Sequence, residues 1–142
     1  MRRVLLLMVA FSWAQSLYAS AEGDCLDGNT CLVTSGAYSG PVRLFCVDTP
    51  PVSNAIGRQA WTALNREYRG TVRILMDSQD NGVPIAEFIR DDGWNLGLEL
   101  IRSGLAKVDR RYCDEISYTI AENEAKDAGH GLWFRLELDP AK

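Results

Sequence analysis

Between residues 25 and 89 the chain alternates apolar and polar residues in short runs separated by turn residues. Runs rich in β-branched and aromatic residues with this period of two are typical of β-strands. The runs predicted to be strands are residues 31–35, 42–48, 71–76 and 85–89. Asn81-Gly82, between the last two, is a strong signal for a β-hairpin turn. The first half of the chain is therefore predicted to be mainly β-structure.

Three further segments repeat apolar residues every three or four positions, which predicts amphipathic helices. The first begins near Ser53, the second runs from Asn95 to Gly104, and the third follows Asp114 and ends at Gly129. Their apolar positions are, helix by helix, Ala60, Trp61, Leu64 and Tyr68; Leu98 and Ile101; and Ile116, Ile120, Ala121, Ala125 and Ala128. One helix interrupts the strands and two follow them, so we expect a single α+β domain.

The first 21 residues are typical of a cleaved signal peptide. Arg2 and Arg3 precede an apolar run, and Ala19-Ser20-Ala21 forms a small-residue cleavage site. A membrane anchor is the alternative, but the run is shorter than the roughly 20 residues that a bilayer requires. We therefore expect residues 1–21 to be removed, residues 22–142 to form the domain, and the protein to be exported to the periplasm or beyond, without a membrane anchor.

Charge argues against a general nucleic-acid binder. The chain of 142 residues has a formal charge of −4, and loss of the two signal arginines leaves 13 basic against 19 acidic residues, a charge of −6. Four aspartates, which are Asp77, Asp80, Asp91 and Asp92, add negative charge to the predicted hairpins. A protein that binds nucleic acid through the phosphates is expected to carry a basic face.

All four cysteines, Cys25, Cys31, Cys46 and Cys113, follow the predicted signal peptide. An even number in an oxidising compartment predicts disulfides, and four cysteines allow three pairings. Cys25 and Cys31 flank the turn-rich sequence LDGNT, so we expect them to bridge a hairpin, which leaves Cys46 with Cys113. A zinc site is the alternative, but there is no C-x-x-C pair and the chain has a single histidine, His130.

Six segments in fixed order resemble the staphylococcal-nuclease-like (thermonuclease) family. They are LDGNT, VRLFCVDTP, GRQAWTAL, GVPIAEF, NLGLELIRSGLAKV and AENEAKDAGHGLW, and together they cover about residues 25–134. The resemblance implies a five-stranded OB-type β-barrel with three helices. It also implies metal-assisted hydrolysis of nucleic-acid phosphodiesters, in which a metal ion and cationic side chains stabilise charge on the phosphate.

The resemblance assigns roles to four residues of this chain. Arg43 lands on the first phosphate-binding arginine, and a guanidinium can hold phosphate oxygens bidentately. Asp48 and Thr49 land on calcium-ligand positions, and Asn29 on a second calcium aspartate. Without the resemblance, Arg43 would be an ordinary strand arginine and Asp48-Thr49 a turn. With it, we expect Arg43 to lie exposed at a groove, pointing toward Asp48 and Asn29, with Val83 packed nearby.

Three positions depart from the family pattern. Pro51 stands where relatives have the glutamate base, Val83 where they have the second arginine, and Asn29 where they have a charged calcium ligand. Calcium affinity follows ligand charge, and Glu67 is the next glutamate downstream of Pro51 but lies far along the first helix. The losses predict a rate lower by about four orders of magnitude or more.

Substrate-binding positions are also altered. Relatives stack bases on aromatic residues near the hairpin turn, where this chain has Asn81, and after the GLAKV block, where Tyr112 remains. Arg110 and Arg111 beside Tyr112 could hold a phosphate backbone, or could belong to a solvated loop next to Cys113. His130, between two glycines, is expected to be a helix C-terminal residue rather than a catalyst.

Two interpretations remain. The first is a secreted, catalytically inactive thermonuclease-fold protein that acts as a binding or interaction module for an unidentified partner and requires no cofactor, with calcium bound weakly at most. The second is a divergent calcium-dependent nuclease with weak activity on DNA or RNA through Arg43, Asp48 and Thr49.

Overall fold

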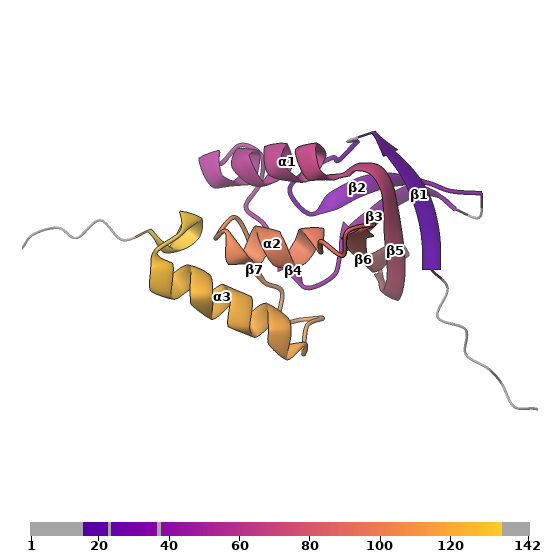
Figure 1. The fold of residues 1–142 in the computed structure, drawn as a ribbon. Helices are drawn as coiled ribbons and strands as arrows, with labels where there is room; N and C mark the ends of the chain where they lie inside the picture. The colour runs from indigo at the N-terminus through magenta and orange to yellow at the C-terminus, as the bar shows by residue number, and fades with distance from the viewer. Residues whose placement is uncertain (1–15, 23, 37, 135–142) are drawn as a thin grey trace, which may run out of the picture.

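The computed structural model describes residues 16–22, 24–36 and 38–134 (Figure 1). The strands are β1 Ser16–Glu22, β2 Thr30–Thr34, β3 Ser39–Leu44, β4 Val47–Asp48, β5 Arg69–Asp80, β6 Val83–Arg90 and β7 Lys107–Val108. The helices are α1 Ala55–Glu67, α2 Leu96–Arg102 and α3 Ile116–Ala128, followed by a 3₁₀ turn, η1 Gly131–Trp133. Figure 1 shows the sheet on one side of the molecule and the helices on the other, with α2 between α1 and α3.

Five strands form one curled sheet in the order β1-β5-β6-β3-β2. All neighbours are antiparallel except β3 and β6, and the two edge strands approach each other so that the sheet closes into a half-barrel. Asn81 and Gly82 make the β5–β6 hairpin turn, both with positive φ, as the Asn-Gly signal predicts. The predicted α+β class, with an OB-type five-stranded sheet and three helices, is confirmed.

The segment 42–48 was predicted as one strand, and this is wrong. The barrel strand β3 ends at Leu44, and Val47–Asp48 belongs to a separate two-stranded sheet with β7. Cys46 between them has φ 65°, a left-handed conformation that breaks a strand. The second sheet brings the chain after α2 beside the end of β3.

Helices α1 and α2 begin at the predicted caps or one residue from them. The Asn54 side chain accepts from the Ile56 N–H, and the Asn95 side chain accepts from the Leu98 N–H. On α1, Ala60 and Leu64 are buried as expected, whereas Trp61 is 39% exposed. The Trp61 prediction is wrong because its indole N–H reaches out to the Cys25 carbonyl at 2.7 Å.

The predicted apolar face of α3 is partly wrong. Ile116 is 74% and Ile120 50% exposed, while the buried residues are Tyr118, Ala121, Glu122 and Ala125. Two of these buried side chains are polar and have hydrogen-bond partners on strands. The Tyr118 hydroxyl donates to Glu87 on β6, and Glu122 accepts from the Val108 N–H on β7. Polar partners as well as apolar area therefore decide which face of α3 is buried. The helix ends at Gly129 with φ 66°, and His130 follows it, exposed.

Both predicted disulfides are present. Cys25 pairs with Cys31, and Cys46 with Cys113, so no cysteine remains for a zinc site. The second bridge links the end of β3 to the loop after β7.

Most of the predicted signal peptide lies outside the described residues, but its last six residues, 16–21, form most of β1. Residues Ser16 to Glu22 pair with β5 from Leu75 back to Arg69. Cleavage after Ala21 stays a prediction, and it would remove all of β1 except Glu22. Among the described residues, no helix combines the length and apolar character needed to cross a membrane.

Candidate functional site

Arg43, on β3, is held by carboxylates. Its Nη1 donates to Asp80 Oδ2 at 2.8 Å, and its Nη2 lies 4.0 Å from Asp109 Oδ2. The Arg43 side chain is 24% exposed, half-buried rather than fully open. Within the described residues its ion-pair partners are these two aspartates, and no ion pair or hydrogen bond joins it to Asp48 or Asn29.

A β-bulge in β5 brings Asp80 to the face of Arg43. The ladder pairs Met76 with Ala86 but Ser78 with Ile85, so one extra residue is inserted before Ser78. Because side chains alternate along a strand, the bulge moves Asp80 to the face that carries Ile85, and Ile85 is the β6 partner of Arg43. Without the bulge, Asp80 would belong to the opposite face.

Asp109 and Arg111 form the second half of the arrangement. Arg111 Nε and Nη2 donate to the two Asp109 carboxylate oxygens at 2.9 and 2.6 Å, and the Arg111 N–H also donates to Oδ1. The Asp109 side chain is 6% exposed. Hydrogen bonds and charge from Arg111, aided by Arg43, hold the pKa of Asp109 below its usual value despite burial. Asp109 therefore stays ionised between two arginines.

Tyr112 completes what we call the Arg43 cluster, which consists of Arg43, Asp80, Asp109, Arg111 and Tyr112. The nearby Asp80 carboxylate is the largest cause that raises the pKa of the Tyr112 hydroxyl. The guanidinium of Arg111 lies 5.1 Å from the Tyr112 ring centroid, within cation–π range. With two arginines and two aspartates, the cluster has no net charge.

The positions that should hold the base and the second arginine have structural uses. The Pro51 carbonyl accepts from the Asn54 N–H at 2.9 Å. A Cβ on Gly57 would lie 2.1 Å from that same carbonyl, so the Pro51 turn is packed directly against α1. Val83 opens β6, half-buried, with Asp80 as its cross-strand partner. Neither residue offers a proton acceptor or a cation to a substrate.

The three candidate calcium positions lie around the turn before β2 and the end of β4. The Asn29 side-chain amide donates to the Val47 carbonyl at 3.2 Å, and its oxygen accepts from the Thr30 hydroxyl at 3.0 Å. Thr49 packs against this turn, because a Cβ on Gly28 would lie 2.9 Å from the Thr49 hydroxyl oxygen. Asp48 supplies the carboxylate of the set.

Arg110, predicted as a nucleic-acid contact with Tyr112, is directed elsewhere. Its Nη2 donates to Glu122 Oε2 at 2.7 Å, and Glu122 is buried on α3. The same carboxylate accepts from Lys126 at 2.8 Å and, through Oε1, from the Val108 N–H at 2.9 Å. Arg110 and Tyr112 thus belong to two different polar clusters.

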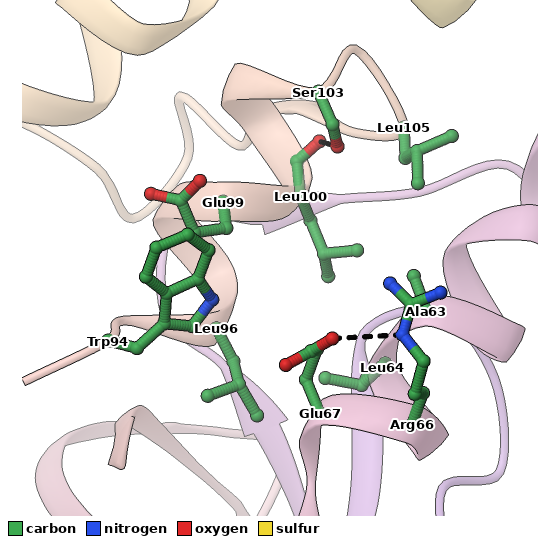
Figure 2. A pocket seen from close by; sticks show the side chains of 10 residues that line it. All are labelled: Ala63, Leu64, Arg66, Glu67, Trp94, Leu96, Glu99, Leu100, Ser103 and Leu105. Atoms are coloured by element: carbon green, nitrogen blue, oxygen red, sulfur yellow. Dashed lines mark hydrogen bonds and ion pairs between the residues drawn. The ribbon is translucent and has the colours of Figure 1, made fainter. Parts of the chain in front are cut away.

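A pocket of about 190 Å³ lies between α1 and α2 (Figure 2), and no residue of the Arg43 cluster lines it. Its lining residues are Ala63, Leu64, Arg66, Glu67, Trp94, Leu96, Glu99, Leu100, Ser103 and Leu105. Arg66 is paired with Glu67, as the dashed line in Figure 2 marks, at a distance of 2.9 Å. Arg90 also donates to Glu67 at 2.5 Å. Glu67 is therefore engaged by two arginines at this pocket.

Comparison with known proteins places the fold in a family. Residues 41–135 match the family described as staphylococcal nuclease homologue. The chain belongs to this family. A protein of Haemophilus influenzae named "Uncharacterized endonuclease" is 31% identical over 114 residues, which are 80% of this chain and 62% of that protein. Two proteins of the same printed name, from Escherichia coli O157:H7 and Escherichia coli, are each 28% identical over 140 residues, 95% of this chain and 90% of theirs.

Staphylococcal nuclease homologues in general use calcium, and the donors present here fit it poorly. Calcium takes six to eight oxygen ligands and depends on carboxylate charge. Asp48 is one carboxylate, whereas the Asn29 amide is neutral and already hydrogen-bonded on both its oxygen and its nitrogen. Across the described part of the chain, no group of three or more His, Cys, Asp or Glu side chains is placed to hold a metal ion.

Sequence reasoning missed the partners of Arg43. The sequence pattern indicates Asp80 only as negative charge on a hairpin, and it does not single out Asp109. The parallel placement of β3 beside β6 would have brought the hairpin near Arg43, but the bulge that decides the face of Asp80 leaves no clear pattern in the sequence. Asp109 follows a two-residue strand, too short to predict from periodicity.

Proposed function

We propose that this staphylococcal nuclease homologue does not hydrolyse phosphodiesters and acts instead as an exported binding module. The observation that carries the proposal is the ion pairing of Arg43 with Asp80 and Asp109. A phosphate-binding arginine stabilises the transition state when its donors face the phosphate. Here those donors face carboxylates of the protein itself.

The other positions support the proposal independently. Pro51 has no group that accepts a proton from water, and Val83 adds no cation beside Arg43. Loss of general-base help lowers the rate by about 10²–10⁴-fold, and loss of one transition-state donor costs about 2.7–4 kcal/mol. Such losses are not additive, but either one alone is large.

Export is part of the proposal. Two disulfides fit an oxidising compartment, and the N-terminal charge and apolar pattern is that of a signal peptide. OB-type barrels bind oligonucleotides, oligosaccharides or peptides on one face. The acidic net charge and the neutral Arg43 cluster favour a partner other than nucleic acid.

The test is hydrolysis of single-stranded DNA and RNA by the oxidised protein, in calcium and in chelator. We expect no hydrolysis above background in either condition. Cleavage that needs calcium and stops with chelator would overturn the proposal in favour of a weak, divergent calcium-dependent nuclease.

A matched set of variants asks whether the missing residues are the reason. The first variant combines Asn29→Asp, Pro51→Glu and Val83→Arg, and the second adds Asp80→Asn to release Arg43. We expect calcium-dependent cleavage to be greater in the second variant than in the first. Circular dichroism and thermal unfolding establish that each variant is folded before its activity is compared with that of the natural protein.

A further inference from the structure

We infer that Asp80 is a built-in anionic ligand of Arg43, which fills with the protein's own carboxylate the place that a phosphate would take. The inference rests on the proposed function and deepens it, because it states what keeps the former phosphate site closed. It assigns to Asp80 a role that concerns anion binding rather than folding.

The contacts are those of a bound anion. Asp80 Oδ2 accepts from Arg43 Nη1 at 2.8 Å, and Oδ1 accepts from the Asn81 side-chain amide at 3.1 Å. The same carboxylate raises the pKa of the nearby Tyr112 hydroxyl. A guanidinium and an amide around one carboxylate are donors that would serve phosphate oxygens equally well.

The remaining charges explain why a free anion does not displace Asp80. Asp109 lies 4.0 Å from the other Arg43 terminal nitrogen and is itself held by Arg111. A phosphate arriving at Arg43 would meet two carboxylates at close range and would have to break the existing ion pair. Tethering adds to this, since the β5–β6 hairpin holds Asp80 at Arg43 at a high effective concentration.

Removal of the Asp80 charge should therefore open an anion site. Asparagine keeps the size and the hydrogen-bonding oxygen of Asp80 but leaves the Arg43 cation unneutralised on that side. The freed Arg43 guanidinium can make a charge-assisted hydrogen bond to phosphate. We therefore expect Asp80→Asn to bind inorganic phosphate at least about tenfold more tightly than the natural protein, which corresponds to about 1.4 kcal/mol.

The experiment titrates inorganic phosphate into each protein at constant ionic strength, with binding followed by calorimetry and by the rise in unfolding temperature. Asp92→Asn is the matched control, because Asp92 is also paired with an arginine, Arg90, at the other end of β6 and its loss changes the net charge equally. The double variant Arg43→Gln, Asp80→Asn identifies the arginine responsible.

We expect a gain in Asp80→Asn, none in Asp92→Asn, and loss of the gain in the double variant. Equal phosphate binding by the natural protein, no gain in Asp80→Asn, or the same gain in Asp92→Asn would each overturn the inference. Asp80→Ser provides a second folded variant if asparagine disturbs the hairpin. The result is separate from the nuclease assay, since the natural protein can lack hydrolysis whether or not Asp80 blocks phosphate.

Discussion

Two carboxylates of this protein, Glu122 and Asp80, each accept from an arginine, yet they are tied to the fold in different ways. The Glu122 side chain is 4% exposed and accepts from the Val108 backbone N–H as well as from Arg110 and Lys126. The Asp80 side chain is 20% exposed, and its partners are side chains.

The difference separates a carboxylate that holds backbone of the fold from a carboxylate that contacts only side chains beside Arg43. The buried Val108 N–H needs an acceptor in this fold, and Glu122 supplies it. Glu122 therefore stabilises the backbone itself. Side-chain partners can be exchanged together without disturbing a backbone ladder. Side chains of the Arg43 cluster can therefore be substituted while the sheet and helices remain.

The largest expected loss of stability comes from removing the Cys46–Cys113 disulfide, which lies beside the Arg43 cluster. The Cys46 carbonyl accepts from the Asp109 N–H, and the Cys113 N–H donates to the Asp109 carbonyl. The Cys46–Cys113 bridge closes 67 residues, so replacing both cysteines by serine should lower the free energy of unfolding by about 4 kcal/mol. Cys25→Ser with Cys31→Ser, which opens a loop of six, should cost about 2 kcal/mol.

Urea unfolding of the two double-serine variants measures this difference. Equal losses of unfolding free energy in the two variants would contradict the prediction. They would indicate that unfolded-state structure, rather than loop length, sets the contribution of each bridge.

A smaller effect is expected at Glu122. Glu122→Ala leaves the buried Val108 N–H without its acceptor and should lower the free energy of unfolding by about 1–3 kcal/mol. Glu122→Gln keeps an acceptor and should cost less. Chemical denaturation near neutral pH checks the order, and an equal loss in both variants would show that charge rather than the backbone bond matters.

The Glu122 variants also differ in pH dependence. Burial would raise the pKa of Glu122, but hydrogen bonds and charge from Lys126, the Val108 N–H and the charge of Arg110 together hold that pKa below its usual value. The stability that Glu122 contributes is therefore complete above the unfolded-state pKa of about 4.3 and is lost as the pH falls through the lower folded-state pKa. In Glu122→Gln this part of the acid destabilisation should disappear.

The smallest effect is expected at Asp80. Partly exposed ion pairs contribute about 0–1 kcal/mol, so Asp80→Asn should change the free energy of unfolding by less than about 1 kcal/mol, even where it changes phosphate binding. A loss as large as that of Glu122→Ala, measured by the same denaturation, would remove the distinction between the two carboxylates.

Much of the fold could be predicted from local patterns. Asn95 caps a helix because its side chain meets a free backbone N–H, and Asn81-Gly82 turns a hairpin because both residues tolerate positive φ. The departures at Pro51 and Val83 were also readable, since a proline and a valine lack the required groups in any conformation. The α3 face was misjudged because Tyr118 and Glu122 are buried by distant hydrogen-bond partners that periodicity does not reveal.

By itself, the sequence determined the family resemblance, the α+β class, most strands and helices and the absence of the base and the second arginine at their expected positions. These depend on neighbouring residues or on the chemical nature of one side chain. The tertiary structure decided the break at Cys46, the burial of Glu122 and the pairing of Arg43 with Asp80. The break depends on the left-handed conformation of Cys46, the burial of Glu122 on partners in other elements, and the pairing of Arg43 on the bulge in β5. Such features depend on tertiary contacts between residues far apart in the chain, which local sequence patterns do not encode.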